Sequence, residues 1–123
     1  MDTVEYWGHR LLHLNFMYGR VHKDHHQLVV PYAFGALYNS YSEVLVIVPL
    51  IVVVFLPFSW LDFIMIQSIS YVATVKQHCA DQNHPHMLHH NGHLNKNFHQ
   101  PFFYFWDKLM GTYFELPVEG LDH

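Results

Sequence analysis

Histidine is the residue type in this sequence with the most chemistry to offer. The chain has 13 histidines in 123 residues, against 6 lysines and arginines together. Eight of them lie in the three short motifs HRLLH, HKDHH and HMLHH, and these eight are His9, His13, His22, His25, His26, His86, His89 and His90. Because residues three and four positions apart share one face of a helix, each motif would present its imidazoles side by side.

Imidazoles gathered in this way indicate metal binding. Protonated imidazoles would repel one another, and buried imidazoles without partners would each carry a desolvation cost. A metal ion removes both problems, since neutral imidazole is a common ligand of iron, zinc, copper and nickel. Eight ring nitrogens exceed the coordination number of one ion, so the motifs predict a centre of two metal ions.

The remaining histidines are less regular in spacing. His78 lies at the end of an apolar stretch and is a ninth candidate ligand. His84, His93 and His99 are expected to support the ligands or to face solvent, and the terminal His123 is expected to have no role. Carboxylates are scarce near the motifs, which argues against the glutamate-rich centres of ferritin-like proteins and against a two-histidine, one-carboxylate iron site.

The histidine motifs flank an apolar stretch that must position them. Asp62 is the only formally charged residue between 44 and 75. The Pro-Phe-Ser corner at 57–59 should end a helix, so we expect helices over 44–56 and 60–76. Each would be roughly 20–25 Å long, short of a hydrocarbon core of about 30 Å. The stretch therefore predicts a hairpin that dips into or barely crosses a membrane; a buried core hairpin of a soluble protein is the alternative.

A hairpin returns the chain to the side from which it left. Arg10, Arg20, Lys23 and Lys76 flank it, and basic flanks favour the cytosolic side. Only 13% of the residues are charged, which excludes a disordered tail and a basic nucleic-acid-binding domain. A single cysteine excludes a disulfide framework within the chain. We expect one all-α, integral-membrane domain over 1–123, with the first motif on a helix and the histidines on the cytosolic side.

Four segments resemble the fatty acid hydroxylase/sterol desaturase superfamily of integral-membrane, non-haem di-iron enzymes. They are YWGHRLLH at 6–13, VHKDHH at 21–26, HMLHH at 86–90 and NFHQPFFYFWDKLMGTYF at 97–114. Within the superfamily, the chain is most similar to sterol hydroxylases of the cholesterol 25-hydroxylase type, because Ser40 and Tyr41 stand where many members have His-Pro. The resemblance implies two iron ions, with zinc as the alternative ion in purified protein, bound by His9, His13, His22, His25, His26, His78, His86, His89 and His90.

The resemblance also implies an activity and its partners. The reaction would be O2-dependent hydroxylation of an unactivated C–H bond in a sterol or fatty-acyl lipid, with no catalytic side chain beyond the metal ligands. Electrons would come from a cytochrome b5-type carrier and its reductase at the endoplasmic reticulum membrane, and no nucleic acid is expected as a partner. Asp107, in the WDKLMGT ending, is a candidate acceptor for the N–H of a ligand histidine.

Two alternatives stay open at this point. A sterol desaturase or C4-methyl oxidase would use the same site. The other alternative is a truncated, non-catalytic metal-binding membrane protein. It is motivated by the superfamily's membrane hairpin before the first motif, because this chain begins eight residues before His9. It is also motivated by the link at 79–85, which is shorter than in relatives.

Overall fold

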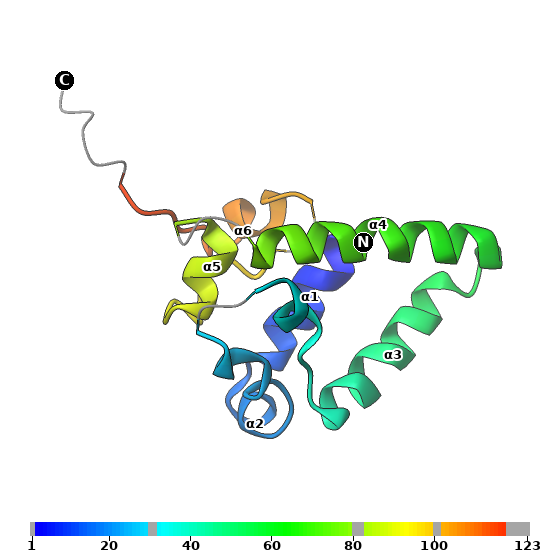
Figure 1. The fold of residues 1–123 in the computed structure, drawn as a ribbon, viewed down its shortest axis with the longest axis horizontal. Coiled ribbons are helices and arrows are strands. Elements are labelled where there is room, and N and C mark those ends of the chain that lie inside the picture. The colour runs from blue at the N-terminus through cyan, green and yellow to red at the C-terminus, as the bar shows by residue number, and fades with distance from the viewer. Residues whose placement is uncertain (1, 30–31, 80–82, 100–101, 118–123) are drawn as a thin grey trace.

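The computed structural model describes residues 2–29, 32–79, 83–99 and 102–117, and its regular elements in these ranges are helices joined by turns and loops (Figure 1). No strand occurs within those ranges, so the prediction of an all-α fold is confirmed. The elements are α1 (Asp2–Leu12), α2 (Asn15–Met17), the π-helical turn η1 (Tyr18–His22), the 3-10 turns η2 (His25–Gln27) and η3 (Ala33–Leu37), α3 (Tyr41–Phe55), α4 (Trp60–His78), α5 (Pro85–His90) and α6 (Phe105–Leu109).

The apolar stretch forms the predicted hairpin of two helices, α3 and α4. Each helix begins at a serine cap: the Ser40 hydroxyl accepts the Glu43 amide at 3.1 Å, and Ser59 forms a capping box with Asp62. The two helices meet at the turn after Phe55 and diverge from it (Figure 1). The opening of this hairpin faces α1, and α5 lies beside the far end of α4.

The outward surface of the hairpin is apolar and exposed. Leu45 and Trp60 are 74% and 79% exposed, and Leu61, Ile64 and Val72 continue the same surface. None of the helices in the described ranges is long and apolar enough to cross a bilayer. The hairpin therefore differs from a buried core hairpin, because its large apolar side chains lie on the outside of the described structure.

The deepest interior of the molecule is polar. Apolar side chains such as Tyr6, Leu12 and Met87 form a small core, and Tyr6 stacks on Trp106 at 6.1 Å between ring centroids, which ties α1 to α6. The largest fully buried side chains, apart from Tyr6, are His78, His86, His89, His99, Glu43, Asn97 and Asp107. Buried polar groups are costly unless each has a partner, so the partners of these side chains decide what the fold can do.

Candidate metal centre

The structure brings all nine predicted ligand histidines together in two neighbouring clusters. In the first, one ring nitrogen of each member lies within 4.8 Å of the others; its members are His9, His13, His22, His26 and His89. The second is defined in the same way by His25, His78 and His90. His86 adjoins the second cluster, with its Nε2 atom 3.3 Å from that of His78. The clusters touch where the rings of His26 and His90 stack at 4.6 Å.

Local backbone geometry distributes two of the motifs between the clusters. α1 ends at Leu12, and a π-helical turn follows in which the Lys23 amide donates to the Tyr18 carbonyl. Such turns occur often at functional sites. As a result, HKDHH places His22 and His26 in the first cluster and His25 in the second. HMLHH divides likewise, with His89 in the first cluster and His90 in the second. The metal partner of each histidine is therefore not readable from motif spacing.

Five of the nine histidines have their Nδ1 atom against an oxygen. The pairs are His9 with the Phe98 carbonyl (3.1 Å), His22 with Glu43 Oε1 (2.7 Å), His25 with the Tyr38 carbonyl (3.1 Å), His78 with the Thr74 carbonyl (2.8 Å) and His89 with the Lys96 carbonyl (2.6 Å). In the four pairs with a backbone carbonyl, the oxygen accepts hydrogen bonds and cannot donate them, so Nδ1 carries the proton of the neutral ring. The Nε2 atom of each ring then keeps its lone pair, as in carbonyl- and carboxylate-supported metal ligands.

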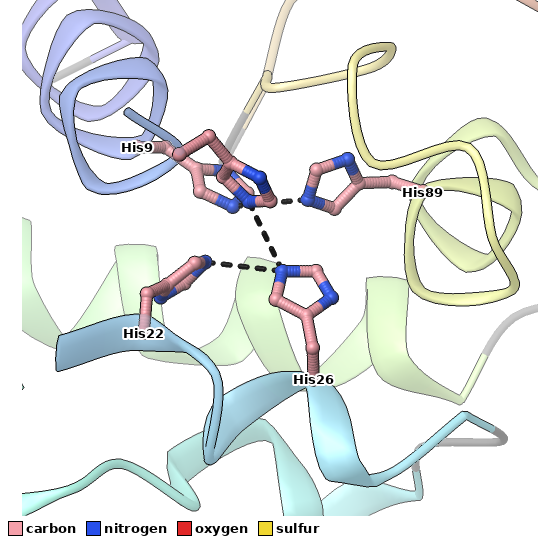
Figure 2. A group of neighbouring side chains, drawn as sticks. His9, His22, His26 and His89 are labelled. Carbon is pink, nitrogen blue, oxygen red and sulfur yellow. Dashed lines mark hydrogen bonds between the residues drawn. The ribbon is translucent and has the colours of Figure 1, made fainter. Parts of the chain in front are cut away.

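These lone pairs face one another. The Nε2 atoms of His9 and His89 are 3.1 Å apart, although neither has a proton to place between them. His26 Nε2 is 3.1 Å from Nε2 of His22 (Figure 2). It is also 3.1 Å from Nε2 of His13. Two nitrogens bound to one ion at about 2.0–2.2 Å each would lie about 2.8–3.6 Å apart, the lower values for octahedral and the upper for tetrahedral angles. The donor set thus fits a metal ion, because a cation converts a repulsive contact into shared coordination.

Burial keeps the imidazoles in the form that binds metal. Desolvation, together with the charge of a neighbouring histidine, lowers the pKa of His13 and His25 to about 4. The pKa of His9, His86 and His89 falls well below 6.5 for the same reasons. These imidazoles are therefore neutral near pH 7 and their lone pairs are available.

Metal-free protein is expected to lose stability as the pH falls below about 6.5. The folded pKa of His13 and His25 is about 4, whereas the unfolded chain titrates near 6.5. The unfolded state therefore binds more protons from about pH 6.5 down to about pH 4, and this favours unfolding. Thermal melting of chelator-treated protein should give a melting temperature that falls progressively from about pH 6.5 to about pH 4. A constant melting temperature across that range would contradict buried neutral imidazoles.

Glu43 is a buried carboxylate beside the first cluster that the sequence analysis did not assign. It is 2% exposed, and its Oε1 atom lies 2.7 Å from Nδ1 of His22, within hydrogen-bonding distance. Burial raises the pKa of Glu43 to about 8. The spacing Ser40-x-x-Glu43 before an apolar run is that of a capping box, and Ser40 does accept the Glu43 amide. The side chain of Glu43 points to His22 and does not return to the cap. The Ser40-x-x-Glu43 spacing was therefore the one feature of the sequence that could have drawn attention to this glutamate.

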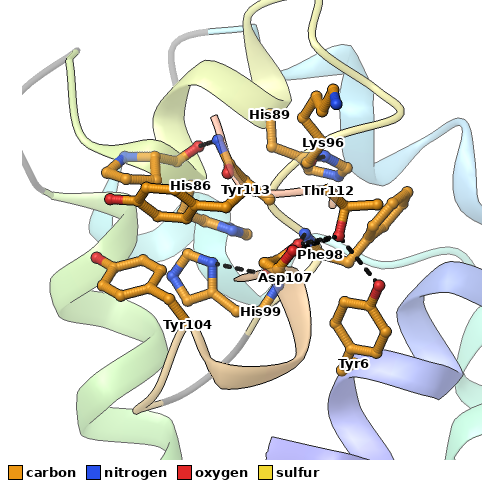
Figure 3. Close-up of polar contacts among 12 residues, drawn as sticks. Tyr6, His86, His89, Lys96, Phe98, His99, Tyr104, Asp107, Thr112 and Tyr113 are labelled. Atoms are coloured by element: carbon orange, nitrogen blue, oxygen red, sulfur yellow. Dashed lines mark hydrogen bonds and ion pairs between the residues drawn. The ribbon is translucent and has the colours of Figure 1, made fainter. Parts of the chain in front are cut away.

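Asp107 supports the centre through the backbone and not through a ligand ring, in contrast to the prediction. Its carboxylate accepts the amides of Phe98 (3.0 Å) and His99 (2.8 Å) and the hydroxyl of Thr112 (2.7 Å; Figure 3). The histidine ring nearest to it is that of His99, with Nδ1 at 3.3 Å. Burial raises the Asp107 pKa, but these hydrogen bonds outweigh it and the net pKa is lowered.

The segment that Asp107 holds carries two of the carbonyls that orient ligands. Lys96 and Phe98 orient His89 and His9, and Asn97 lies between them with φ at 56°. The Asn97 amide group donates to the Pro85 and Phe114 carbonyls at 2.8 and 2.7 Å and accepts the Phe114 amide. Asn tolerates this left-handed conformation better than most residues.

Other histidines have structural roles. His84 caps α5 by accepting the His86 amide through Nδ1 at 3.3 Å. His93 packs on Phe114, with ring centroids 4.3 Å apart. His99 is buried beside Asp107 and Tyr104, and His123 lies outside the described residues.

A helical protein with two adjacent all-histidine clusters has the donor set of a dimetal centre. The family model described as fatty acid hydroxylase matches residues 1–112. The chain belongs to the fatty acid hydroxylase family, and its clusters are consistent with the dimetal site typical of that family.

Several curated proteins are similar to nearly the whole chain. Sphinganine C4-monooxygenase 2 of Arabidopsis thaliana is 35% identical over 97% of the chain and 53% of its own length. Sphingolipid C4-hydroxylase sur2 of Schizosaccharomyces pombe is 36% identical over 92% of the chain and 45% of its own length. Very-long-chain aldehyde decarbonylase GL1-9 of Oryza sativa is 34% identical over 92% of the chain and 51% of its own length. The chain spans about half the length of these relatives. No solved structure matches.

The comparisons correct the subfamily prediction. The sphinganine and sphingolipid C4 enzymes described above match over nearly the whole chain, and none of them is named as a cholesterol 25-hydroxylase. A methylsterol monooxygenase of Arabidopsis thaliana matches over 36% of the chain. The physical reason is that the residues behind the prediction have supporting roles. Ser40 caps α3, and Phe98, His99 and Thr112 hydrogen-bond to Asp107. Segments that cap helices and hold the backbone do not report which lipid is bound.

Proposed function

We propose that this chain is the metal-binding part of an O2-dependent di-iron hydroxylase that acts on a long-chain sphingoid base. The observation that carries the proposal is the convergence of Nε2 lone pairs on rings whose Nδ1 protons are held by oxygens. The substrate class rests on relatives named for sphinganine and sphingolipid C4 oxidation. Hydroxylation is favoured over the sterol desaturase alternative because those names describe addition of oxygen.

The nine histidines divide the work of binding two ions. We assign one ion to His9, His13, His22, His26 and His89, and the other to His25, His78, His86 and His90. When bound, the two irons supply the activation of O2 that oxidises an unactivated C–H bond. The chain itself holds each ring in one tautomer, surrounds the centre with buried side chains and positions the lipid.

The exposed hairpin surface supports a membrane location. We propose that the apolar faces of α3 and α4 insert into a bilayer, since a soluble protein rarely exposes so large an apolar surface. The basic residues Arg10, Arg20 and Lys23 would then lie on the cytosolic side. The endoplasmic reticulum, a cytochrome b5-type donor with its reductase, and a single domain over 1–123 are parts of the same proposal.

Iron content and product analysis test this function directly. The chain, purified in detergent and loaded with ferrous iron without oxygen, is expected to retain two irons and to convert sphinganine to a hydroxylated product when O2 and reductant are added. A desaturated product would support the desaturase alternative. An aldehyde-consuming activity would support a function like that of the rice relatives. Two bound irons with no turnover of any of these lipids would contradict the proposal in favour of a non-catalytic metal protein.

A further inference from the structure

Tyr6 is a buried phenol that lies between the first cluster and the protein surface. It precedes His9 by three positions, which places the two side chains on one face of α1. Its ring meets the ring of Phe98 edge-on, with centroids 6.1 Å apart. That ring in turn contacts the rings of three members of the first cluster, His9 at 5.7 Å, His13 at 5.2 Å and His89 at 5.5 Å. A row of ring contacts therefore connects Tyr6 to the metal-binding histidines.

Two tryptophans continue this row of rings to the outside of the molecule. The ring centroids of Trp7 and Trp106 lie 5.3 and 6.1 Å from that of Tyr6 and 5.7 Å from each other. Tyr6 is 1% exposed, whereas Trp7 is 42% exposed. Phenol and indole rings can lose one electron and stay covalently intact. The row of rings can therefore carry single electrons between a buried metal centre and a reductant in solution.

The Tyr6 hydroxyl begins a chain of hydrogen bonds that ends on a buried carboxylate (Figure 3). The Thr112 hydroxyl donates to Asp107 Oδ1 at 2.7 Å. Since a hydroxyl has one proton to donate, Thr112 Oγ1 is the acceptor in its 3.0 Å contact with the Tyr6 hydroxyl. Burial raises the Asp107 pKa, but the hydrogen bonds to its carboxylate outweigh this effect, so the group is charged and can accept a proton. The phenolic proton of Tyr6 therefore points along a chain to a base.

Arg10 acts on the same phenol from the other side. Its guanidinium donates to the Tyr6 oxygen at 3.0 Å and lies 6.0 Å from the centroid of the Tyr6 ring. A fixed positive charge at this distance opposes a second positive charge on the ring. A Tyr6 ring that loses an electron must therefore lose its proton as well, and the hydrogen bond to Thr112 provides the path. The geometry couples electron transfer from Tyr6 to proton transfer.

We propose, on the basis of the proposed function, that Tyr6 donates an electron to the dimetal centre when O2 has oxidised that centre with no lipid bound. Tyr6 loses one electron to the centre and its phenolic proton to Thr112 Oγ1, while the Thr112 hydroxyl proton passes to Asp107. The phenol O–H bond breaks, the centre is reduced by one electron and Asp107 becomes a neutral acid. A one-electron reductant in solution, such as ascorbate, restores the phenol through the exposed Trp7 as Asp107 returns the proton. Tyr6 thus removes oxidising equivalents that would otherwise attack the ligand histidines.

Electron paramagnetic resonance of freeze-quenched samples tests the proposal. The iron-loaded chain without lipid, mixed with O2, is expected to form a neutral tyrosyl radical whose signal narrows when the protein contains ring-deuterated tyrosine. Tyr6→Phe should retain two irons and lose this signal. Tyr18→Phe is the matched control and should keep it, because the Tyr18 ring lies 5.2 Å from that of His13 but its hydroxyl is outside the chain to Asp107. A missing radical in the unmodified protein, or a radical that survives Tyr6→Phe, would overturn the proposal.

Thr112 variants test the proton path, and they do so even if Tyr6→Phe fails to fold. Thr112→Val removes the hydroxyl and keeps the shape of the side chain, so the radical should be lost with iron intact. Thr112→Ser keeps the hydroxyl and should keep the radical. In the unmodified protein the radical should form more slowly in D2O than in H2O, because a proton moves with the electron. An undiminished radical in Thr112→Val, or equal rates in the two solvents, would contradict coupled transfer to Asp107.

Oxidative damage supplies a readout that separates this proposal from the proposed function. After repeated exposure of lipid-free, iron-loaded protein to O2, mass spectrometry should find more ligand histidines with an added oxygen atom in Tyr6→Phe than in the unmodified chain. With sphinganine present, both proteins should form hydroxylated lipid in the first turnover. Hydroxylated lipid together with equal histidine damage in the two proteins would leave the hydroxylase function standing and refute the role of Tyr6. Iron-loaded protein that does not react with O2 at all would contradict the proposed function and this proposal with it.

Discussion

Replacing His89 by alanine is expected to reduce the bound iron from two ions per chain to one and to bring O2-dependent lipid hydroxylation down to background. His89 is fully buried, its Nδ1 proton is held by the Lys96 carbonyl at 2.6 Å, and its Nε2 atom is 3.1 Å from that of His9. Alanine removes a lone pair from the first cluster and leaves a cavity that water can enter. Chemistry that needs both ions stops when one site loses its ligand set.

Metal analysis by mass spectrometry together with product formation measures this effect. His93→Ala is the matched control, because His93 lies four residues further along and packs on Phe114 outside both clusters. That variant should retain two irons and its activity. Full iron occupancy in His89→Ala, with the protein folded, would remove the third motif from the ligand set and contradict the assignment of the first cluster.

Replacing Asp107 by alanine is expected to lower the free energy of unfolding by about 3–5 kcal/mol, because it leaves several buried donors without an acceptor. The Phe98 and His99 amides and the Thr112 hydroxyl all donate to this carboxylate. The Phe98 carbonyl, which orients His9, belongs to the segment that would come loose. Iron affinity should therefore fall about 10- to 100-fold as well, the size of effect seen when ligand-supporting groups are removed.

Chemical denaturation of the metal-free chain and a chelator competition for iron provide the two measurements. Asp107→Asn keeps an acceptor oxygen and should lose less stability than Asp107→Ala. Lys108→Ala, at the exposed neighbouring position, should cost little. If Asp107→Ala loses stability while its iron affinity stays at the wild-type value, the proposed link from Asp107 through the backbone to His9 would be wrong.

Residue spacing alone was sufficient for the parts of the site that depend on short-range geometry. The three motifs identified eight histidines, and the end of the apolar stretch added His78; all nine meet in the structure. The hairpin was equally predictable, because uninterrupted apolar residues and the Pro57 corner specify two helices and a turn. Its observed bounds, Tyr41–Phe55 and Trp60–His78, differ from the predicted ones by a few residues at the ends, where serine caps decide the boundary.

Long-range contacts explain what the spacing did not predict. Glu43 belongs to a capping sequence, and it becomes a partner of His22 only because α3 begins beside η1. Asp107 lies in a motif that suggested contact with a ligand ring, but the turn at Asn97 places backbone amides in its reach first. The prediction of a hairpin that dips into or barely crosses a membrane depended on helix length as well as on composition. No helix in the described ranges is long and apolar enough to span a bilayer.

The high histidine count and its grouping were enough, by themselves, to predict a centre of two metal ions, and the observed histidine clusters are consistent with that prediction. Only the tertiary structure decided how the histidines are shared, since His25 and His26 are neighbours in sequence yet belong to different clusters. The reason is that coordination depends on where lone pairs point. The direction of each lone pair is set by the acceptor at Nδ1 of the same ring. For His9 that acceptor is the Phe98 carbonyl, from a distant part of the chain, and for His89 it is the Lys96 carbonyl, in the loop that follows α5.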